Sequence, residues 1–94
     1  MASITVKFNG IWRLYLGTDR ALMDAADIET ALAKIEKEYA IKLEEKFKER
    51  GVKLQKSILD YSYIVLNGKN TKTLRERSLR DGDVMDLFIA VPGG

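Results

Sequence analysis

Apolar and polar side chains alternate at the start of the chain. Ile4, Val6 and Phe8 take one side of an extended segment, and polar residues take the other side. A period of two is typical of a strand with one buried face. We therefore expect a half-buried strand over residues 3–8.

A second alternating run follows the dipeptide Asn9-Gly10. Its apolar positions are Trp12, Leu14 and Leu16. We expect a second strand here, joined to the first by a three-residue hairpin loop over residues 8–10. This register keeps the apolar residues of both strands on one face, with Val6 opposite Trp12.

The middle of the chain has the spacing of one long amphipathic helix. Residues 18–26 are interpreted as a connection, and Asp27 is a candidate N-cap. Apolar residues then recur every three or four positions and form one stripe. These positions are Ile28, Ala31, Leu32, Ile35, Tyr39, Leu43 and Phe47. Gly51 is a candidate C-terminal stop. Because the helix is long for this chain, we expect a kink or break near Phe47, where it extends beyond the sheet.

The last third of the chain combines β-forming residues with turn signals. We expect a third strand over Ile58–Leu66, ended by a turn at Asn67-Gly68. Residues 69–80 are polar and basic and are interpreted as a connection. A tight turn at Asp81-Gly82-Asp83 then leads into a last strand over Val84–Val91.

Two strands, a helix and two further strands predict an α+β domain, in which a helix covers one face of a sheet. If the first and last strands are neighbours in the middle, this is a β-grasp (ubiquitin-like) arrangement. It has a mixed sheet of four to five strands with one main helix packed across one face. We expect residues 1–94 to form this single domain, with a flexible C-terminal tail over residues 89–94.

Composition excludes several kinds of chemistry. The chain contains no Cys and no His, which excludes thiolate nucleophiles, disulfides, Ser-His-Asp triads and most zinc sites. Its net charge of +2 is too balanced to suggest nucleic acid, although residues 69–80 are locally basic. The start of the chain is unlike a signal peptide, and no apolar run is long enough to span a bilayer. We expect a cytoplasmic protein with no membrane partner.

The segment Leu79–Gly94 resembles the C-terminal end of the MoaD/ThiS family of ubiquitin-like sulfur carriers. It is most similar to the MoaD branch, the small subunit of molybdopterin synthase. In that branch an Asp-Gly-Asp turn precedes an apolar strand and a terminal Gly-Gly. The spacing from Asp81 to the end of this chain agrees without gaps. The matching positions are Phe88, Val91, Gly93 and Gly94.

The resemblance implies that Gly94 is the working residue. Its carboxylate would be adenylated by a separate ubiquitin-activating-type enzyme that uses ATP. A sulfur donor protein would then supply the sulfur of a thiocarboxylate. In the MoaD branch, the large subunit of molybdopterin synthase accepts the carrier. The chain itself would bind no cofactor or metal and would contain no catalytic residue.

The residue types around Gly94 fit such a role. A C-terminal carboxylate has a pKa of about 3.3–3.7, so it is ionised and needs activation before sulfur can replace an oxygen. Gly93 and Gly94 have no side chain to obstruct a narrow channel. A proline disfavours the helical conformation of the residue before it, so Pro92 is expected to bias Val91 toward an extended conformation. A glycine pair alone is more typical of a frayed terminus, but its spacing from Asp81 favours the functional interpretation.

Phe88 is the candidate partner-binding residue. In the alternation of the last strand it shares a face with Asp86, and we expect this face to be the less buried one. An exposed Phe close to a reactive tail is a candidate anchor for a partner, and the family places a docking contact at this position. Asp81 and Asp83 could form a carboxylate pair for acid–base or metal chemistry, but a turn is the simpler interpretation.

Three functions remain open on the sequence. The first is a sulfur carrier for molybdopterin synthesis. The second is a related carrier for thiamin or tRNA thiolation, or a small protein modifier linked through Gly94. The third is a β-grasp interaction module with an inert tail, because a fold alone does not determine function.

Overall fold

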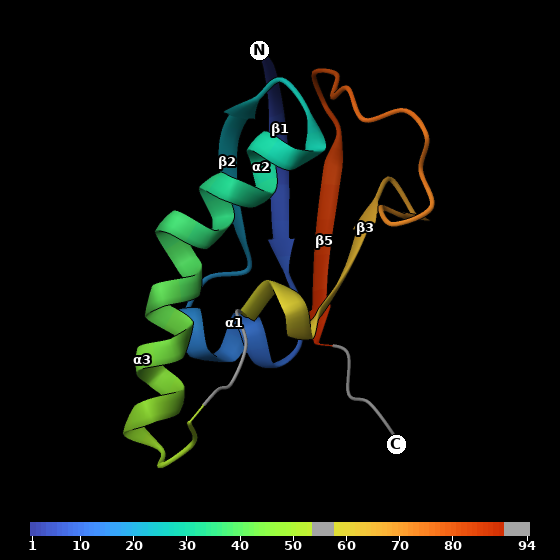
Figure 1. Cartoon of the computed structure of the whole chain (residues 1–94). Helices are drawn as coiled ribbons and strands as arrows, with labels where there is room; N and C mark the ends of the chain where they lie inside the picture. The colour runs from blue at the N-terminus through green and yellow to red at the C-terminus, as the bar shows by residue number, and fades with distance from the viewer. Residues whose placement is uncertain (54–57, 90–94) are drawn as a thin grey trace.

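One five-stranded sheet organises the computed structural model, which describes residues 1–53 and 58–89. Its strands are β1 (Ala2–Phe8), β2 (Arg20–Ala25), β3 (Ser62–Leu66), β4 (Lys69–Asn70) and β5 (Val84–Ile89). The strand order is β2-β1-β5-β3-β4. β1 and β5 are parallel neighbours in the middle, and the other pairs are antiparallel (Figure 1). The predicted α+β class, mixed sheet and central pair are therefore confirmed.

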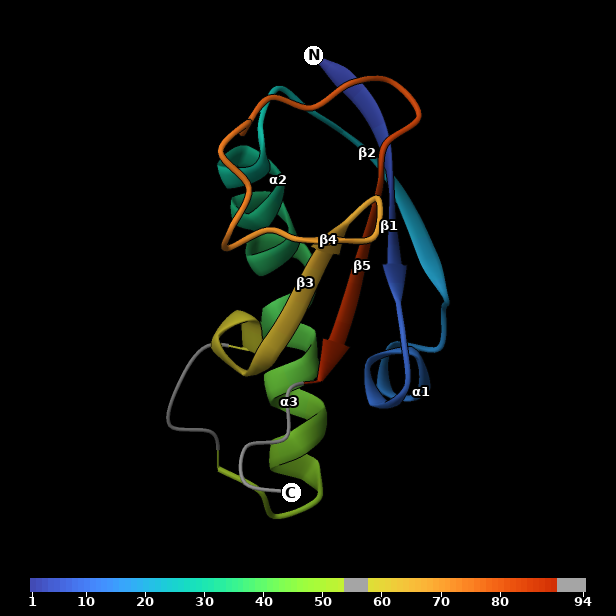
Figure 2. The same cartoon turned by 90° about the vertical axis from the view of Figure 1, so that its right-hand side faces the viewer.

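A helical layer covers one face of this sheet (Figure 2). It consists of α2 (Ile28–Ile35), a π-helical turn η1 (Glu36–Ala40) and α3 (Ile41–Glu49). The predicted cap is confirmed, because the backbone N–H of Thr30 donates to Asp27 Oδ1 at 2.8 Å. The predicted stop is confirmed as well. Gly51 has φ 78°, and its N–H donates to the carbonyl oxygen of Lys48.

The helix departs from α geometry at η1 and not near Phe47, so the predicted kink is wrong in position. The last buried residue of α2 is Ile35, and the next buried positions are Ala40 and Leu43. A π turn contains one extra residue, which rotates the stripe of buried positions. This rotation keeps Leu43 and Phe47 directed at the rest of the protein.

The predicted second strand is wrong, because Ile11–Leu16 form a short helix, α1. Gly10, at φ 58° and ψ −125°, turns the chain out of β1 into this helix. The more buried positions of α1 are Trp12, Tyr15 and Leu16. They follow a helical period, whereas Leu14 is 72% exposed. Over so few residues, alternation and a helical period both fit the apolar pattern.

The strand that pairs with β1 is β2, inside the segment that the pattern assigns to a connection. Val6 pairs with Ala21 and not with Trp12, so the predicted hairpin loop over residues 8–10 is also wrong. The sequence pattern hides β2 because Leu22, which is 82% exposed, faces outward, while the small Ala21 faces inward.

The C-terminal third follows the prediction more closely. The expected third strand is shorter, because Ile58–Tyr61 form a 3-10 turn and β3 begins at Ser62. Asn67 and Gly68, with φ 49° and 84°, form the predicted turn into β4. Positive φ at both central residues is what the preferred two-residue hairpin turn requires. Gly82, with φ 89°, lies in the predicted turn before β5.

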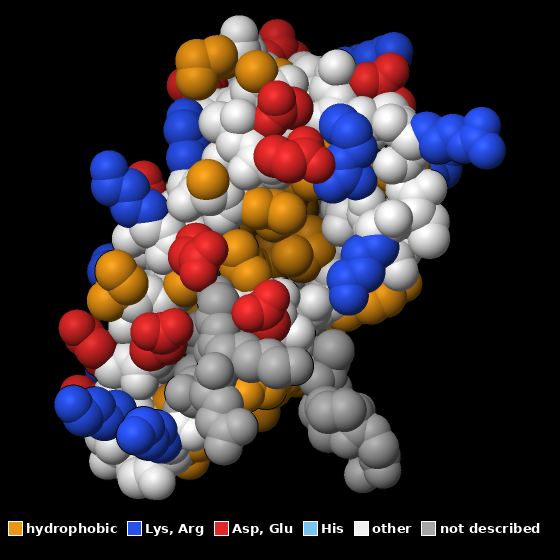
Figure 3. Space-filling view, viewed as in Figure 1, with side chains coloured by type: hydrophobic (Ala, Val, Ile, Leu, Met, Phe, Trp, Pro, Cys, Tyr) orange, Lys and Arg blue, Asp and Glu red, His pale blue; other side chains and the backbone are white. Residues whose placement is uncertain are grey.

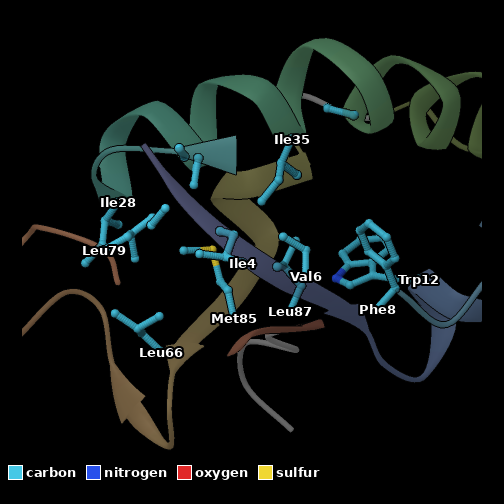
Figure 4. Close-up of a cluster of buried hydrophobic side chains, with 14 of the residues drawn as sticks. Ile4, Val6, Phe8, Trp12, Ile28, Ile35, Leu66, Leu79, Met85 and Leu87 are labelled. Carbon is cyan, nitrogen blue, oxygen red and sulfur yellow. The ribbon is translucent and has the colours of Figure 1, made fainter. Parts of the chain in front are cut away.

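The core lies between the sheet and the helical layer (Figure 4). Side chains from β1 and β5 meet side chains from α2 in this layer. The largest fully buried residues are Trp12, Phe8, Ile4, Ile28, Ile35, Met85, Leu87 and Val6. Full burial of an apolar side chain of this kind stabilises a protein by roughly 1.5–3 kcal/mol.

Charged side chains gather on the outer side of α2 and α3, and apolar side chains are visible between these helices and β5 (Figure 3). Within the two described ranges, no helix is long and apolar enough to cross a membrane.

Candidate functional site

The candidate partner-binding residue lies at the end of β5. Phe88 is on the face of the sheet opposite the helices and is 41% exposed, whereas its neighbour Leu87 is buried in the core. The predicted exposure of Phe88 is therefore confirmed. Its role in docking stays a prediction.

Of the predicted tail over residues 89–94, the structure describes only Ile89. This residue belongs to β5 and pairs with Ser62. The remaining tail candidates lie outside the described residues; they are Val91, Pro92, Gly93 and Gly94. β5 ends at the end of the sheet that carries α1, opposite the N-terminus (Figure 1).

Tyr63 is a candidate that sequence reasoning missed. It is the register partner of Phe88 in the antiparallel pair β3–β5, and it is 45% exposed. Opposed residues in neighbouring strands interact as a cross-strand pair, and aromatic residues are enriched at protein interfaces. The alternation around Tyr63 is visible in the sequence. The pairing with Phe88 becomes visible only once β3 and β5 are known to be neighbours.

A row of charged residues borders this aromatic pair. Lys7 is the register neighbour of Asp86 in β5 and of Arg20 in β2. We call Phe88, Tyr63, Lys7 and Asp86 the candidate docking face. It combines an exposed apolar patch with charged groups of both signs, as protein-binding surfaces commonly do.

Asn9 lies directly beside the end of β5. Its backbone N–H donates to the carbonyl oxygen of Leu87 at 3.1 Å. Its side-chain Nδ2 donates to the same oxygen and to Asp86 Oδ1, at 3.2 Å in each case. Gly10 then turns the chain away from the sheet. The Asn9 side chain thus holds Asp86 and Leu87 of β5 at the point where β1 ends.

Asp81 and Asp83 act as turn acceptors at the other end of β5. Asp81 Oδ1 accepts the backbone N–H of Ser3 at 2.8 Å. Asp83 accepts the backbone N–H of Arg80 at 2.8 Å and Asn67 Nδ2 at 2.9 Å. The turn interpretation is confirmed. In the described part of the chain, no group of three or more acidic residues could hold a metal ion.

The basic segment contributes one structural residue. Arg77 Nε donates to Glu29 Oε1 at 2.7 Å, and its Nη1 donates to the carbonyl oxygens of Thr71 and Leu74. These contacts hold residues 69–80 against α2. Arg77 is therefore not available as a free cation for steering a partner.

The altered pKa values belong to structural contacts. The hydrogen bond from Thr30 lowers the pKa of Asp27. The hydrogen bond from Arg77 lowers the pKa of Glu29. Burial raises the pKa of Tyr39, and the nearby charge of Glu38 adds to this rise. Each shift follows from a capping contact, an ion pair or packing.

Solved structures match this arrangement along nearly the whole chain. Small archaeal modifier protein 1 (SAMP1) from Methanosarcina acetivorans has a TM-score of 0.71 and 26% identity, over 100% of this chain and 98% of that one. A putative molybdopterin converting factor, subunit 1, from Pyrococcus furiosus has a TM-score of 0.65 and 22% identity, over 97% and 100%. The chain has the ubiquitin-like β-grasp fold.

A further β-grasp neighbour comes from a complex. A chain of the complex of subunits 1 and 2 of molybdopterin-converting factor from Helicobacter pylori 26695 has a TM-score of 0.62 and 25% identity, over 98% of this chain and 99% of that one. No protein-family model and no curated protein matches the chain. The structural neighbours are MoaD/ThiS-like, so the resemblance at Leu79–Gly94 extends to the fold.

Proposed function

We propose that this chain is a sulfur carrier with Gly94 as its attachment site, and that it serves as the small subunit of a molybdopterin synthase. The observation that carries the proposal is a β-grasp fold with MoaD/ThiS-like neighbours, in which the last strand presents an exposed Phe88 shortly before a terminal Gly-Gly. A neighbour from a complex of molybdopterin-converting factor subunits supports this pathway.

The chemistry proceeds at the Gly94 carboxylate. A carboxylate oxygen attacks the α-phosphorus of ATP on a ubiquitin-activating-type partner, and pyrophosphate leaves. The terminal sulfur of a persulfide on a donor protein then attacks the acyl carbon, and AMP leaves with the acyl–oxygen bond pair. A donor thiol cleaves the resulting acyl disulfide, which releases the Gly94 thiocarboxylate and a donor disulfide. The carrier supplies only its terminus.

The candidate docking face would anchor the domain while the tail reaches the partner's nucleotide. Gly94 follows Phe88 by six positions, from 88 to 94. A fully extended chain covers at most about 3.3–3.6 Å per residue, so Gly94 lies within roughly 20 Å of Phe88. A partner that holds Phe88 must therefore place its ATP site within that distance.

Intact-mass measurement tests the proposal. The chain is co-expressed with a ubiquitin-activating-type enzyme and a persulfide donor from its source. We expect the mass gain of one sulfur replacing one oxygen, located on the C-terminal peptide. Deletion of Gly94 removes this gain. An unmodified terminus on the intact chain, under conditions where a known carrier is modified, contradicts the proposal.

A matched pair of variants tests the docking face. Phe88→Ser removes the proposed anchor, and Leu22→Ser removes an exposed apolar side chain from β2, away from β5. We expect Phe88→Ser to reduce thiocarboxylate formation strongly and Leu22→Ser to leave it unchanged. Equal yields from both variants contradict the docking role of Phe88.

A second candidate function is protein modification through Gly94. The neighbour with a TM-score of 0.71 is named a small archaeal modifier protein, which favours this alternative over an inert module. Isopeptide adducts between Gly94 and lysines of other proteins, found by mass spectrometry of cell extract, support it. Capture of a molybdopterin synthase large subunit, without such adducts, supports the carrier.

A further inference from the structure

We propose that Asn9 is a positioning residue that holds Asp86 and Phe88 of the candidate docking face in place at the end of β5. This inference rests on the proposed function, because it concerns how the docking face is presented to an activating partner. It assigns a role to the residue directly after β1, to which the sequence pattern assigned only a loop position.

The backbone ladder between β1 and β5 ends at Asn9. The register pairs of the two strands run from Thr5 with Val84 to Phe8 with Leu87. The N–H of Asn9 then makes the last backbone contact, with the carbonyl oxygen of Leu87. Beyond this point the first part of the chain turns into α1. Phe88 and Ile89 keep register partners only in β3, which are Tyr63 and Ser62.

The side chain of Asn9 reinforces this last contact. Nδ2 lies 3.2 Å from the carbonyl oxygen of Leu87 and 3.2 Å from Asp86 Oδ1. The carbonyl of Leu87 belongs to the peptide unit that leads into Phe88. With two donors on this oxygen, the peptide plane has little freedom to rotate. Asn9 thus fixes this peptide unit from the β1 side, and the pairing with Tyr63 holds Phe88 from the β3 side.

A fixed docking face matters for binding more than for chemistry. A partner that binds Asp86 and Phe88 must otherwise order these residues on association, and this ordering costs free energy. Loss of the Asn9 contacts is thus expected to raise the KM of the carrier. It leaves kcat unchanged, because Asn9 touches no reacting atom.

Asn67 offers a matched control at the opposite end of the same strand. Its Nδ2 donates to Asp83 Oδ1, and its Oδ1 accepts the backbone N–H of Val84, at 2.9 Å in both cases. Asn67→Ala therefore removes a comparable pair of asparagine side-chain hydrogen bonds from β5. It does so at the first residue of the strand and leaves the contacts of Leu87 intact.

The experiment measures ATP–pyrophosphate exchange by the activating enzyme with wild type, Asn9→Ala, Asn9→Asp and Asn67→Ala as the carrier. We expect Asn9→Ala to raise KM about five- to tenfold, as the loss of one or two hydrogen bonds implies. Asp has nearly the same shape as Asn but places an oxygen, in place of the Nδ2 donor, against the Leu87 carbonyl and Asp86 Oδ1. Because these oxygens repel one another, Asn9→Asp is expected to raise KM at least as much. Asn67→Ala is expected to keep the wild-type KM.

A second readout does not depend on activity. Backbone ¹⁵N relaxation of the free chains is expected to show lower order parameters at Phe88 and Ile89 in both Asn9 variants, and unchanged values in Asn67→Ala. An unchanged KM in Asn9→Ala, or an equal rise in Asn67→Ala, overturns the positioning role. No exchange with wild type, where a known carrier is active, overturns the proposed function, and this inference falls with it.

Discussion

Side-chain hydrogen bonds cluster where β5 begins, whereas aromatic rings cluster at the end of the sheet that carries α1. We call the first region, Asn67 with residues 80–84, the turn pole. Its contacts are side-chain hydrogen bonds at 2.8–2.9 Å, two of them to backbone N–H groups and one between side chains. We call the second region the aromatic pole; it consists of Phe8, Trp12, Tyr15, Tyr39 and Phe47. Its ring centroids lie 4.8–6.0 Å apart.

This difference explains why the structure of the turn pole can be predicted from the sequence, whereas that of the aromatic pole cannot. The turn pole is built by Asn-Gly and Asp-Gly-Asp, whose residues dictate local backbone conformation. The aromatic pole depends on contacts between α1 and α3, such as Trp12 with Phe47. Such contacts exist only after the π turn has rotated α3 into place. The positions of the five aromatic residues in the sequence therefore do not predict these contacts.

The largest expected effect comes from breaking the aromatic pole. Trp12 is 1% exposed and contacts Phe47 edge-on at 6.0 Å. Trp12→Ala leaves a cavity between α1 and α3, and substitutions of this kind cost about 3–5 kcal/mol. Urea unfolding followed by circular dichroism measures this loss. A loss below about 1 kcal/mol would show that the aromatic pole contributes little to stability.

Trp12→Phe is the matched control for that measurement. Among the described residues, Trp12 Nε1 is a buried donor with no hydrogen-bond partner, and an unsatisfied buried donor costs about 1–3 kcal/mol. Phe removes this donor and keeps an aromatic ring. Trp12→Phe is thus expected to lose much less stability than Trp12→Ala in the same urea experiment.

An intermediate effect is expected at the turn pole. Asn67→Ala removes two side-chain hydrogen bonds and places an alanine at φ 49°. We expect a loss of about 2 kcal/mol, because both the lost bonds and the left-handed backbone conformation cost free energy. Thermal unfolding measures the loss. Asn67→Gly, which tolerates this φ, separates the backbone contribution from the hydrogen bonds.

The smallest effect concerns acid stability at the start of α2. The bond from Thr30 lowers the pKa of Asp27, so the ionised carboxylate stabilises the folded state. This contribution is present above the ordinary Asp pKa of about 3.9 and is lost as the pH falls through the lower folded-state value. Asp27→Asn retains a capping oxygen without the charge. Its melting temperature should fall less than that of wild type on acidification, and an equal fall contradicts the prediction.

Much of the fold could be predicted from the sequence, and the candidate site only in part. The period of two predicts β1 and β5, and the capping and turn residues Asp27, Gly51 and Gly82 are where the pattern places them. Phe88 is exposed as its alternation with Leu87 indicates.

The residues that the sequence did not reveal are those whose role depends on which strands are neighbours. The partnership of Tyr63 with Phe88 and the contact of Asn9 with Leu87 join segments far apart in the chain. No local pattern encodes which strands lie side by side, so neither residue could be assigned from spacing alone. The edge strand β2 stayed hidden for another reason, since its outward Leu22 breaks the expected contrast between the two faces.

The parallel pairing of β1 with β5 has a mechanical consequence. The chain enters the sheet at one end of this pair and leaves β5 at the other (Figure 1). A force that pulls the end of β5 away from Met1 would slide the two central strands past each other. Such a shear force acts on all the hydrogen bonds between the two strands at once. A load between Met1 and the end of β5 therefore meets the combined resistance of the hydrogen bonds between the two central strands.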